Sequence, residues 1–438
     1  MGPPQADVAL REALAMGCDD ALLISDRAFG GADTWATSST IAAALKKLDY
    51  DVIITGRQAI DGDTAQVGPQ IAEHLGIPQV SYVEKMDVEG EDTLVVQRQF
   101  EDRHQIIEVK TPCLLTALAE LADPRYMSVH GVFDAYREKE VKVWGLEDIK
   151  DTVNEGNIGL KGSPTRVKKS FTKQAKGAGT ILNDLSDDEA VAAIVEKITG
   201  KNTSFKVRRT IKMCKDVYVF AEQRDGNLQK VGIELIGEAR KLADDLGQNV
   251  VAVLLGNQIK DKASELIAHG ADKVVVVDDE MLAEYVTEPY AKAMMEIIQS
   301  HNPEIVLYGA TSIGRDLAPR VSARIHTGLT ADCTKLDIDE ETKLLMMTRP
   351  AFGGNIMATI VCEDFRPQMA TVRPGVMKAL EADESRQGEV EVVEVNFTDA
   401  DMNVKIREVV KTTHKSVDIT EAKILVAGGR GVGNAERI

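Results

Sequence analysis

The chain has little of what marks several large classes of protein. Aromatic residues make up 4% of its 438 residues, too few for a surface that stacks nucleic-acid bases. The formal charge of −18 argues against binding to a phosphate backbone, which needs clustered lysines and arginines. No apolar run reaches the length of a membrane-spanning helix. We therefore expect no nucleic-acid partner and no membrane span.

Cysteine and histidine are also sparse. The five cysteines lie singly with no CxxC pair, which favours reduced thiols in a cytoplasm over a disulfide framework. The opening residues MGPPQADVAL lack the basic segment and long apolar stretch of a signal peptide, so we predict a cytoplasmic location. The seven histidines are scattered without metal-ligand spacing. We expect neither a metal site nor a catalytic set of Ser, Cys and His.

What the chain does contain is an internal repeat at an offset of 253 residues. The sequence DVIITGRQAIDGDTAQ (51–66) returns as EIVLYGATSIGRDLAP (304–319). Earlier positions recur at the same offset: Glu12, Ala15, Gly17, Asp19 and Asp26 return as Glu265, Ala268, Gly270, Asp272 and Asp279. A shared spacing across helices, strands and loops predicts two copies of one module. Paired modules share an interface, and such interfaces are favoured places for a cofactor.

Strands alternate with helices in both copies. In the first copy, residues 51–55 form a continuous apolar run, which predicts a parallel strand buried on both faces, and residues 64–75 are predicted to be a helix. The second copy also shows opening strands at 216–220 and 249–255, with a helix at 229–246 between them. This alternation predicts an α/β fold with two pseudo-symmetric, doubly wound parallel sheets.

The first copy lacks counterparts of those opening elements, because the chain's first residue corresponds to residue 254. We interpret it as a module truncated at its start, with an exposed sheet edge and poor stability on its own. We place the first domain at 1–200, a linker at 201–212 and the second domain at 213–420. Residues 421–438, a strand followed by a glycine-rich turn, are typical of the start of a further nucleotide-binding domain.

The strongest candidate site is the loop GRQAIDGDTAQVGP (56–69), between the end of a predicted strand and the start of a helix. Ligands bind at this end of parallel strands, and a helix N-terminus offers free amides and partial positive charge to a phosphate. We predict Asp63 as the helix N-cap, while Gly62 allows close backbone approach. The alternative is a capped helix after an ordinary loop, and spacing alone favours neither.

A second candidate is the segment MTRPAFGGN (347–355), which combines a cation, an aromatic ring and two glycines. A flat ring system would be able to lie on Gly353 and Gly354 while Arg349 stabilises negative charge on it. The alternative is a β-hairpin turn with a solvated arginine. In the second copy, the loop equivalent to residues 56–69 carries Arg315, for which a surface ion pair is at least as good an interpretation as a ligand contact.

These motifs resemble the electron transfer flavoprotein family over nearly the whole chain. Residues 1 to about 200 are similar to a beta subunit, through SDRAFGGADT, GRQAIDGDTAQVGP, ADPRYMS and GSPTRVKKSF. Residues from about 212 to 438 are similar to an alpha subunit, through KDVYVFAEQRDG, ATSIGRDLAPRVSARIHTGL, TRPAFGGN and AKILVAGGRGVG. The resemblance implies an electron carrier in which two usually separate subunits are fused. It also implies Rossmann-like domains of the adenine nucleotide alpha hydrolase-like type.

In this family the beta module binds AMP in ordinary members and a second FAD in the electron-bifurcating group. The forms DGDTAQVGP and TRPAFGGN resemble the bifurcating group, in which NADH reduces the FAD of the beta module. The resemblance therefore implies three sets of cofactor-binding residues. They are a phosphate loop of Gln58, Asp61, Gly62, Asp63, Thr64, Ala65, Gln66, Val67 and Gly68; flavin-ring contacts from Arg349, Phe352, Gly353 and Gly354; and the weaker candidates Thr330 and Asp332.

The resemblance also implies partners. Electrons would come from NADH, or from an acyl-CoA dehydrogenase or related flavoenzyme, and would pass to a ferredoxin or flavodoxin and to an electron-shuttling FAD. The loop that recognises the dehydrogenase would fall near Gly145–Lys150. Three alternatives stay open at this point: an ordinary member that holds structural AMP, a non-redox nucleotide-binding α/β module, and a purely structural docking subunit.

Overall fold

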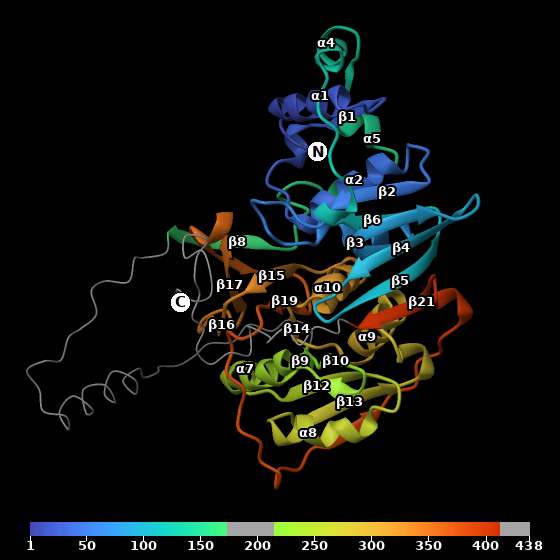
Figure 1. Ribbon diagram of the computed structural model, residues 1–438. Coiled ribbons are helices and arrows are strands. Elements are labelled where there is room, and N and C mark those ends of the chain that lie inside the picture. Colours follow the sequence, from blue (N-terminus) through green and yellow to red (C-terminus); the bar gives the residue numbers. More distant parts are fainter. Residues whose placement is uncertain (173–213, 412–438) are drawn as a thin grey trace, which may run out of the picture.

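Two α/β halves built on one plan stack on each other in the computed structural model, which describes residues 1–172 and 214–411 (Figure 1). The predicted linker at 201–212 and the predicted domain start at 421–438 lie outside the described residues. Within these ranges, no helix is both long and apolar enough to cross a lipid bilayer.

The first half contributes α1 to α5 and β1 to β8. In chain order they are α1 (Asp7–Ala15), β1 (Ala21–Ile24), α2 (Thr34–Leu45), β2 (Val52–Gly56), α3 (Val67–Leu75), β3 (Gln79–Val88), β4 (Thr93–Gln99), β5 (Arg103–Lys110), β6 (Cys113–Ala117), α4 (Val129–Arg137), β7 (Val141–Trp144), α5 (Leu146–Ile149) and β8 (Arg166–Thr172).

The second half contributes the remaining helices and strands. They are β9 (Val217–Phe220), β10 (Gln223–Arg224), β11 (Asn227–Leu228), α7 (Lys230–Leu246), β12 (Val250–Gly256), α8 (Ala263–Ala268), β13 (Lys273–Asp278), α9 (Thr287–His301), β14 (Ile305–Gly309), α10 (Ser312–Ile325), β15 (Leu329–Cys333), β16 (Lys335–Ile338), β17 (Leu345–Ala351), β18 (Ile356–Val361), β19 (Gln368–Val372), β20 (Glu389–Val392) and β21 (Val404–Lys411).

The second half contains a doubly wound sheet of seven parallel strands, in the order β15-β19-β14-β9-β12-β13-β20. Alternate residues of β9 face opposite sides: Val219 packs with α7 and α8, whereas Phe220 packs with α9 and α10. Both faces of the sheet are therefore covered, as buried parallel strands require. The predicted fold class is confirmed here.

The first half has a six-stranded mixed sheet, β2-β6-β3-β4-β5-β21, and a separate parallel pair, β1-β7. By sequence offset, β1 and β2 correspond to β13 and β14, which β9 and β12 separate in the second half. No counterpart of β9 or β12 exists among the described residues of the first half, so β2 forms the edge of its sheet. The prediction of a strand buried on both faces is therefore wrong, and Ile54 is 53% exposed.

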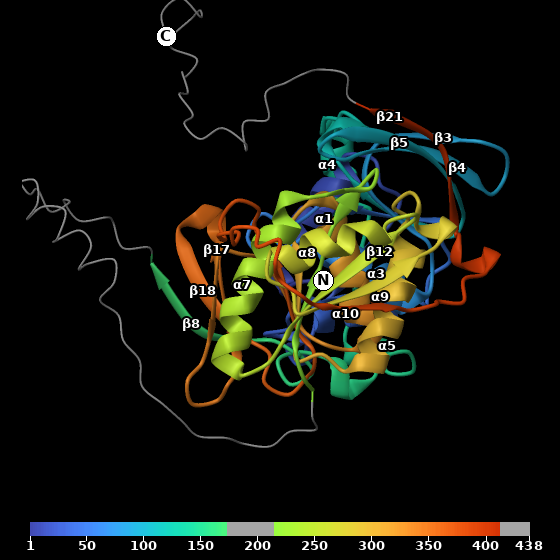
Figure 2. The same cartoon turned by 90° about the horizontal axis from the view of Figure 1, so that it is seen from below.

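Each half lends a strand to the other. β8 of the first half pairs antiparallel with β18, completing the sheet β16-β17-β18-β8. β21 of the second half pairs antiparallel with β5 at the edge of the first sheet. Figure 1 and the view from below in Figure 2 both show these exchanged strands beside their partners. The two bodies in space therefore do not coincide with two continuous stretches of sequence.

Helices α3 and α10 meet at the junction of the halves. Glu73 on α3 lies 2.6 Å from Arg320 and 2.8 Å from Arg324, and both arginines also contact Glu288. These charges are mostly buried, so removing one partner would leave another uncompensated. This network joins the two halves at their junction.

Candidate functional site

A cavity of about 870 Å³ lies where the two halves meet, which is within the range of small-molecule sites. The loop predicted to bind phosphate and Arg349 of the other half both contribute to its wall. Its lining comprises Gly31–Thr34, Thr37, Ala59, Asp61, Gly62, Thr64, Gln66, Val67, Leu160, Lys161 and Thr165–Val167 from the first half, and Leu329–Ala331, Arg349 and Ile360 from the second.

The loop before α3 differs from its predicted form. The helix starts at Val67, its N-cap is Gln66, and Asp63 accepts a hydrogen bond from the side-chain amide of Gln58. The prediction that Asp63 caps the helix is therefore wrong. Its physical reason is the backbone, because Asp63 and Ala65 adopt left-handed φ angles of 52° and 55°, which interrupt a helix.

The same backbone leaves this helix end open to an anion. No side chain caps α3 at Gln66, and left-handed residues in a loop are a feature of anion-binding nests of backbone amides. The side chain of Gln66 bridges the halves instead: it accepts from Thr34 at 2.5 Å and donates to the Leu329 carbonyl at 3.1 Å. The helix start is thus positioned by both halves.

Gly68 has a packing role beneath the loop. A Cβ atom at this position would lie 2.7 Å from the Thr55 hydroxyl and 3.0 Å from the Thr116 methyl group. Glycine therefore lets α3 approach β2 and β6 closely. Gly68 and Ala65 do not line the cavity, and Ala65 is buried. These two predicted residues therefore pack beneath the loop and do not face the cavity.

Arg349 is a buried cation that has no acidic partner among the described residues. Arg349 lies on β17 and is 5% exposed. Its guanidinium group donates to the Asp63 carbonyl at 3.4 Å. Among the described residues no carboxylate lies within ion-pair distance of it, and its Nε atom has no hydrogen-bond partner. Burial lowers the pKa of Arg349. An unpaired buried charge costs free energy, so an anionic ligand in the cavity would stabilise it.

Thr330, on β15, adds a second unsatisfied polar group to the same wall. Its hydroxyl is buried and has no hydrogen-bond partner among the described residues. Buried polar atoms normally have partners, and those that do not call for an explanation. Thr330 thus joins Arg349 as a buried polar residue of the cavity wall that has an unsatisfied atom among the described residues.

Phe352, Gly353 and Gly354 form the tip of the β17–β18 hairpin. Their φ angles of 50°, 65° and 86° are left-handed, which explains the glycine pair. The tip reaches the other half, since the Phe352 amide donates to the Asp61 carbonyl at 3.2 Å. None of the three lines the cavity, and Phe352 is 56% exposed. Their predicted contact with a flavin ring stays a prediction.

A second cavity of about 540 Å³ lies on the other side of the loop. Asp332 contributes to it, buried and paired with Arg315 at 3.1 Å and Arg373 at 2.5 Å. The predicted residues thus divide between two cavities. The larger is lined by Asp61, Gly62, Thr64, Gln66, Val67, Thr330 and Arg349, and the smaller by Gln58, Asp63 and Asp332.

Two stretches of the larger cavity's wall were not predicted. Residues 31–37 and 160–167 both line it, from the loop before α2 and the segment leading into β8. Their signal was present, since both belong to the motifs SDRAFGGADT and GSPTRVKKSF. Composition alone does not mark them as ligand contacts, because small residues such as Gly31, Ala32 and Thr37 and single cations such as Lys161 and Arg166 occur on many surfaces.

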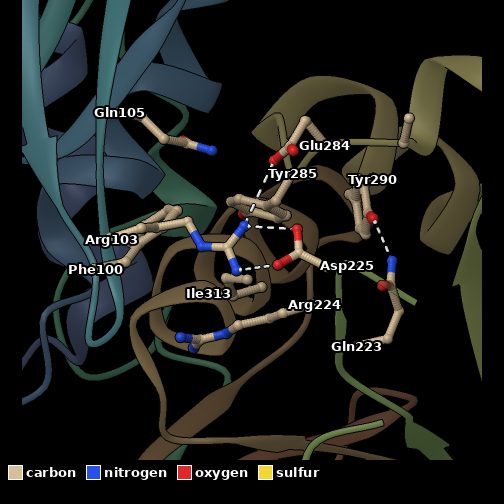
Figure 3. Close-up of a pocket in the computed structure, with 11 residues that line it drawn as sticks. Phe100, Arg103, Gln105, Gln223, Arg224, Asp225, Glu284, Tyr285, Tyr290 and Ile313 are labelled. Carbon is tan, nitrogen blue, oxygen red and sulfur yellow. Dashed lines mark hydrogen bonds and ion pairs between the residues drawn. The ribbon is translucent and has the colours of Figure 1, made fainter. Parts of the chain in front are cut away.

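The equivalent place in the second half is closed. At the offset of 253, Ala32 and Thr37 become Tyr285 and Tyr290, and only about 20 Å³ remains. The Tyr285 hydroxyl donates to Asp316 at 2.7 Å, and the Tyr290 hydroxyl donates to the Leu282 carbonyl at 2.9 Å. Figure 3 shows these rings beside Arg103, which crosses from the first half to Asp225. In the second half, side chains therefore fill the space that forms the large cavity in the first half.

Comparisons with known proteins assign a family. A model described as the electron transfer flavoprotein domain matches residues 1–149 and 217–398. The electron transfer flavoprotein subunit beta of Clostridium acetobutylicum is 62% identical over 198 residues, covering 45% of this chain and 74% of the relative. The subunit alpha of Thermoanaerobacterium thermosaccharolyticum is 54% identical over 222 residues, covering 51% of this chain and 67% of the relative.

A third relative is named for the complex in which it occurs. The caffeyl-CoA reductase-Etf complex subunit CarD of Acetobacterium woodii is 52% identical over 203 residues, which cover 46% of this chain and 76% of that protein. This chain thus spans about two thirds to three quarters of each relative that it matches. Taken with the paired α/β halves, the matches show that the chain belongs to the electron transfer flavoprotein family and joins beta-type to alpha-type sequence.

Proposed function

We propose that the larger cavity binds FAD and that the protein is the base of an electron-bifurcating electron transfer flavoprotein. The observation that carries the proposal is that one cavity is lined both by Arg349, which is buried without an acidic partner among the described residues, and by the uncapped start of α3. A dinucleotide brings both a pyrophosphate and a ring that becomes negatively charged on reduction. The two features would therefore be satisfied by one ligand.

Each side of the cavity would have its own task. The amides around residues 62–67 would hold phosphate oxygens, aided by the partial positive charge of the α3 N-terminus. Arg349 would stabilise negative charge on the ring, and the Thr330 hydroxyl would bond to a polar atom of the ligand. When bound, the flavin supplies the electron-transfer chemistry, and the chain supplies orientation, exclusion of water and electrostatics.

NADH is the proposed electron donor, and a ferredoxin or flavodoxin is the proposed acceptor, in a cytoplasmic setting. An ordinary member of the family that holds AMP in the same cavity is the second candidate. It is compatible with the wall at Gly31–Thr34 and Thr37, whose small residues leave room for an adenosine. The two candidates differ in whether the bound ligand carries a redox-active ring.

We further propose that an acyl-CoA dehydrogenase or related flavoenzyme docks on α4. The loop near Gly145–Lys150 that the sequence suggested includes α5, whose Ile149 is fully buried. Exposed apolar side chains gather instead at α4, where Tyr126 is 98% and Val129 is 77% exposed. The other exposed apolar residues there are Met127, Val132, Phe133 and Tyr136. Clustered apolar side chains of this kind mark interaction surfaces.

The test is the visible spectrum of the protein purified without added nucleotide and mixed with NADH under anaerobic conditions. Flavin bands that bleach with NADH would support the bifurcating form. A colourless protein that releases AMP on denaturation would support the ordinary form. A protein that retains neither nucleotide, and binds neither when they are added, would overturn both.

Arg349→Ala should lower the reduction potential of the bound flavin, because it removes a cation near the ring. Arg349→Lys is the matched control, since it keeps the charge and should preserve most of the potential. An Arg349→Ala potential equal to that of the unaltered protein would place Arg349 away from the ring.

A further inference from the structure

The stretch before α3 and its counterpart in the second half belong to the internal repeat but differ in structure. At the offset of 253, residues 59–66 correspond to residues 312–319, which form the first part of α10. In the first half the helix starts only at Val67. One helical hydrogen bond remains before it, from the Asp63 amide to the Ala59 carbonyl at 2.8 Å, and left-handed backbone follows. The first half thus has an isolated turn where the second half has a continuous helix.

An isoleucine that is present in both copies shows how far the position of this turn differs. Ile313, on α10, is 4% exposed and packs in the core of the second half with Tyr285 and Tyr290. It also lines the pocket of about 20 Å³ that remains there, as Figure 3 shows. Its counterpart Ile60 is 96% exposed and does not line the large cavity. The side chain that helps to fill the closed site is therefore turned toward solvent at the open one.

A glycine explains why the second half can place its turn against the sheet. Gly314 is the third residue of α10, and a Cβ atom there would lie 1.9 Å from the carbonyl oxygen of Gly309, the last residue of β14. Such an approach is too close for any side chain, so only glycine fits. The helix start also has an N-cap, because the Thr311 hydroxyl accepts from the Gly314 amide at 3.0 Å.

The first half has neither feature. At the same offset the glycine of α10 is replaced by Asp61, and the strand residue that it contacts corresponds to Gly56. A turn seated as in α10 would therefore drive the Asp61 Cβ atom into the backbone at the end of β2, and no side-chain rotation relieves such an overlap. The N-cap is replaced by Gln58, whose side chain donates to Asp63 instead. The turn must lie farther from its sheet than the start of α10 does.

The displaced turn leaves backbone amides free for a ligand. In a continuous helix the amides of residues 64–66 would donate to carbonyls one turn earlier. Here they donate to no backbone carbonyl of the described residues, and two of the three residues line the large cavity. The Asp61 carbonyl, which a helix would pair with one of them, accepts from the Phe352 amide of the other half at 3.2 Å. The same displacement thus exposes Ile60 and frees amides at the cavity wall.

We infer that Asp61 is a positioning residue whose Cβ atom prevents the turn at 59–63 from seating on the end of β2. Asp61 thereby keeps Ile60 out of the cavity and the amides of residues 64–66 available to a ligand. This inference deepens the proposed function and rests on it only for the identity of the ligand. The position of the turn follows from the comparison of the two halves, so it can be measured without a nucleotide.

The experiment compares two variants that differ by one Cβ atom. Gln58→Thr with Asp61→Gly copies the start of α10, whereas Gln58→Thr with Asp61→Ala adds the same cap and removes the same carboxylate but keeps the Cβ atom. Amide hydrogen exchange is measured by mass spectrometry on nucleotide-free protein. Exchange at residues 64–66 should be slower in the glycine variant by about tenfold or more, because these amides become bonded within a helix. A merely more flexible loop, the ordinary effect of glycine, would speed exchange instead.

Nucleotide binding provides a second readout. The glycine variant should bind FAD or AMP about tenfold more weakly than the alanine variant, measured by equilibrium titration. Adding Ile60→Ala to the glycine variant should recover part of that affinity, because the smaller side chain leaves more of the cavity open. A role of Asp61 in local stability alone would not produce this recovery.

Equal hydrogen exchange at residues 64–66 in the glycine and alanine variants would overturn the inference, and so would faster exchange in the glycine variant. If the combined glycine variant fails to fold, judged by circular dichroism, Asp61→Gly and Asp61→Ala alone serve the same comparison. Failure of the proposed function would show separately, as an unaltered protein that binds neither FAD nor AMP, and the exchange measurement would still decide the role of Asp61.

Discussion

The two halves share a fold, yet they fill the same place differently. In the first half, Ala32 and Thr37 border a cavity of about 870 Å³. In the second half, the tyrosines at the equivalent positions, Tyr285 and Tyr290, leave about 20 Å³. Two of the side chains that differ between the halves therefore fill space in the second half that is open in the first. Fold alone would assign a ligand to both halves, and only the side chains distinguish them.

The halves also differ in how completely their sheets are covered. In the second half, β9 lies between β14 and β12 and is fully buried. In the first half, β2 has no neighbour on one side and exposes Ile54. The open half thus combines a ligand cavity with an open sheet edge, and we expect most of the stability to come from the closed half. The following variants test this contrast, from the largest expected effect to the smallest.

Tyr285→Ala should give the largest loss of stability. The ring is buried at the closed site and its hydroxyl bonds to the buried Asp316, so truncation leaves a void and removes one hydrogen bond to that carboxylate, to which Thr287 and Gln79 still donate. We expect the free energy of unfolding to fall by about 3–5 kcal/mol, measured by urea denaturation. Tyr126→Ala, at an exposed tyrosine, should change it by no more than about 0.5 kcal/mol. Equal effects would contradict the view of Tyr285 as core.

His74 should make the interface between the halves sensitive to acid. Burial lowers the pKa of His74 to about 4, below its ordinary value near 6.5, because the charged form is poorly solvated. The unfolded chain therefore takes up the proton first. The stability that depends on neutral His74 is fully present above about pH 6.5 and is lost as the pH falls toward 4. The full loss is about 3 kcal/mol.

The measurement is urea denaturation between pH 4 and 7 for the unaltered protein and His74→Phe. The variant should lose the part of the pH slope that belongs to this residue. His130→Gln is the matched control, since His130 is mostly exposed, and its slope should match that of the unaltered protein. An unchanged slope in His74→Phe would mean that another group causes the acid sensitivity.

Ala32→Tyr combined with Thr37→Tyr should close the open site by copying the second half. The two rings would enter the space in which we propose that the nucleotide binds. We expect the affinity for FAD or AMP to fall by roughly a hundredfold, or about 2.7 kcal/mol, measured by equilibrium titration. Ala32→Ser with Thr37→Ser is the control and should keep the affinity. A folded tyrosine variant that binds normally would show that the ligand lies elsewhere.

The smallest expected effect concerns the surface ion pairs of the exchanged strands, which should contribute little to the free energy of unfolding. Lys168 of β8 lies 2.8 Å from Asp339, and Lys411 of β21 lies 2.8 Å from Asp225, with both lysines exposed. Lys168→Gln and Lys411→Gln should each lower the free energy of unfolding by less than about 1 kcal/mol, and less at high salt. A larger loss at one lysine only would show that the two exchanged strands are not equivalent.

Local sequence patterns predicted the repeated helices and strands well, but they did not predict which strands lie side by side in the sheets. The offset of 253 paired β2 with β14 and β1 with β13, and the loop and Arg349 did come to one cavity. The burial of β2 was predicted wrongly, because it depends on strands that lie beside it in space. The strand exchange was not predicted, since β8 and β21 pair with strands far away in sequence.

The details of the loop were harder to predict for another reason. Asp63 and Ala65 adopt left-handed backbone although neither is a glycine, so the residue types in the loop did not indicate this conformation. The closure of the second half was visible in principle, because aligning the two copies places Tyr285 over Ala32 and Tyr290 over Thr37. That alignment shows a change of size, and only the packed structure shows that the rings fill the space.

The number of nucleotide sites per chain tests the central contrast most directly. FAD is titrated by calorimetry into protein freed of nucleotide, for the unaltered chain and for the variant with Ala32→Tyr and Thr37→Tyr. We predict one site per chain, which the variant loses. Two sites per chain, or one site that persists in the variant, would contradict a single open site in the first half.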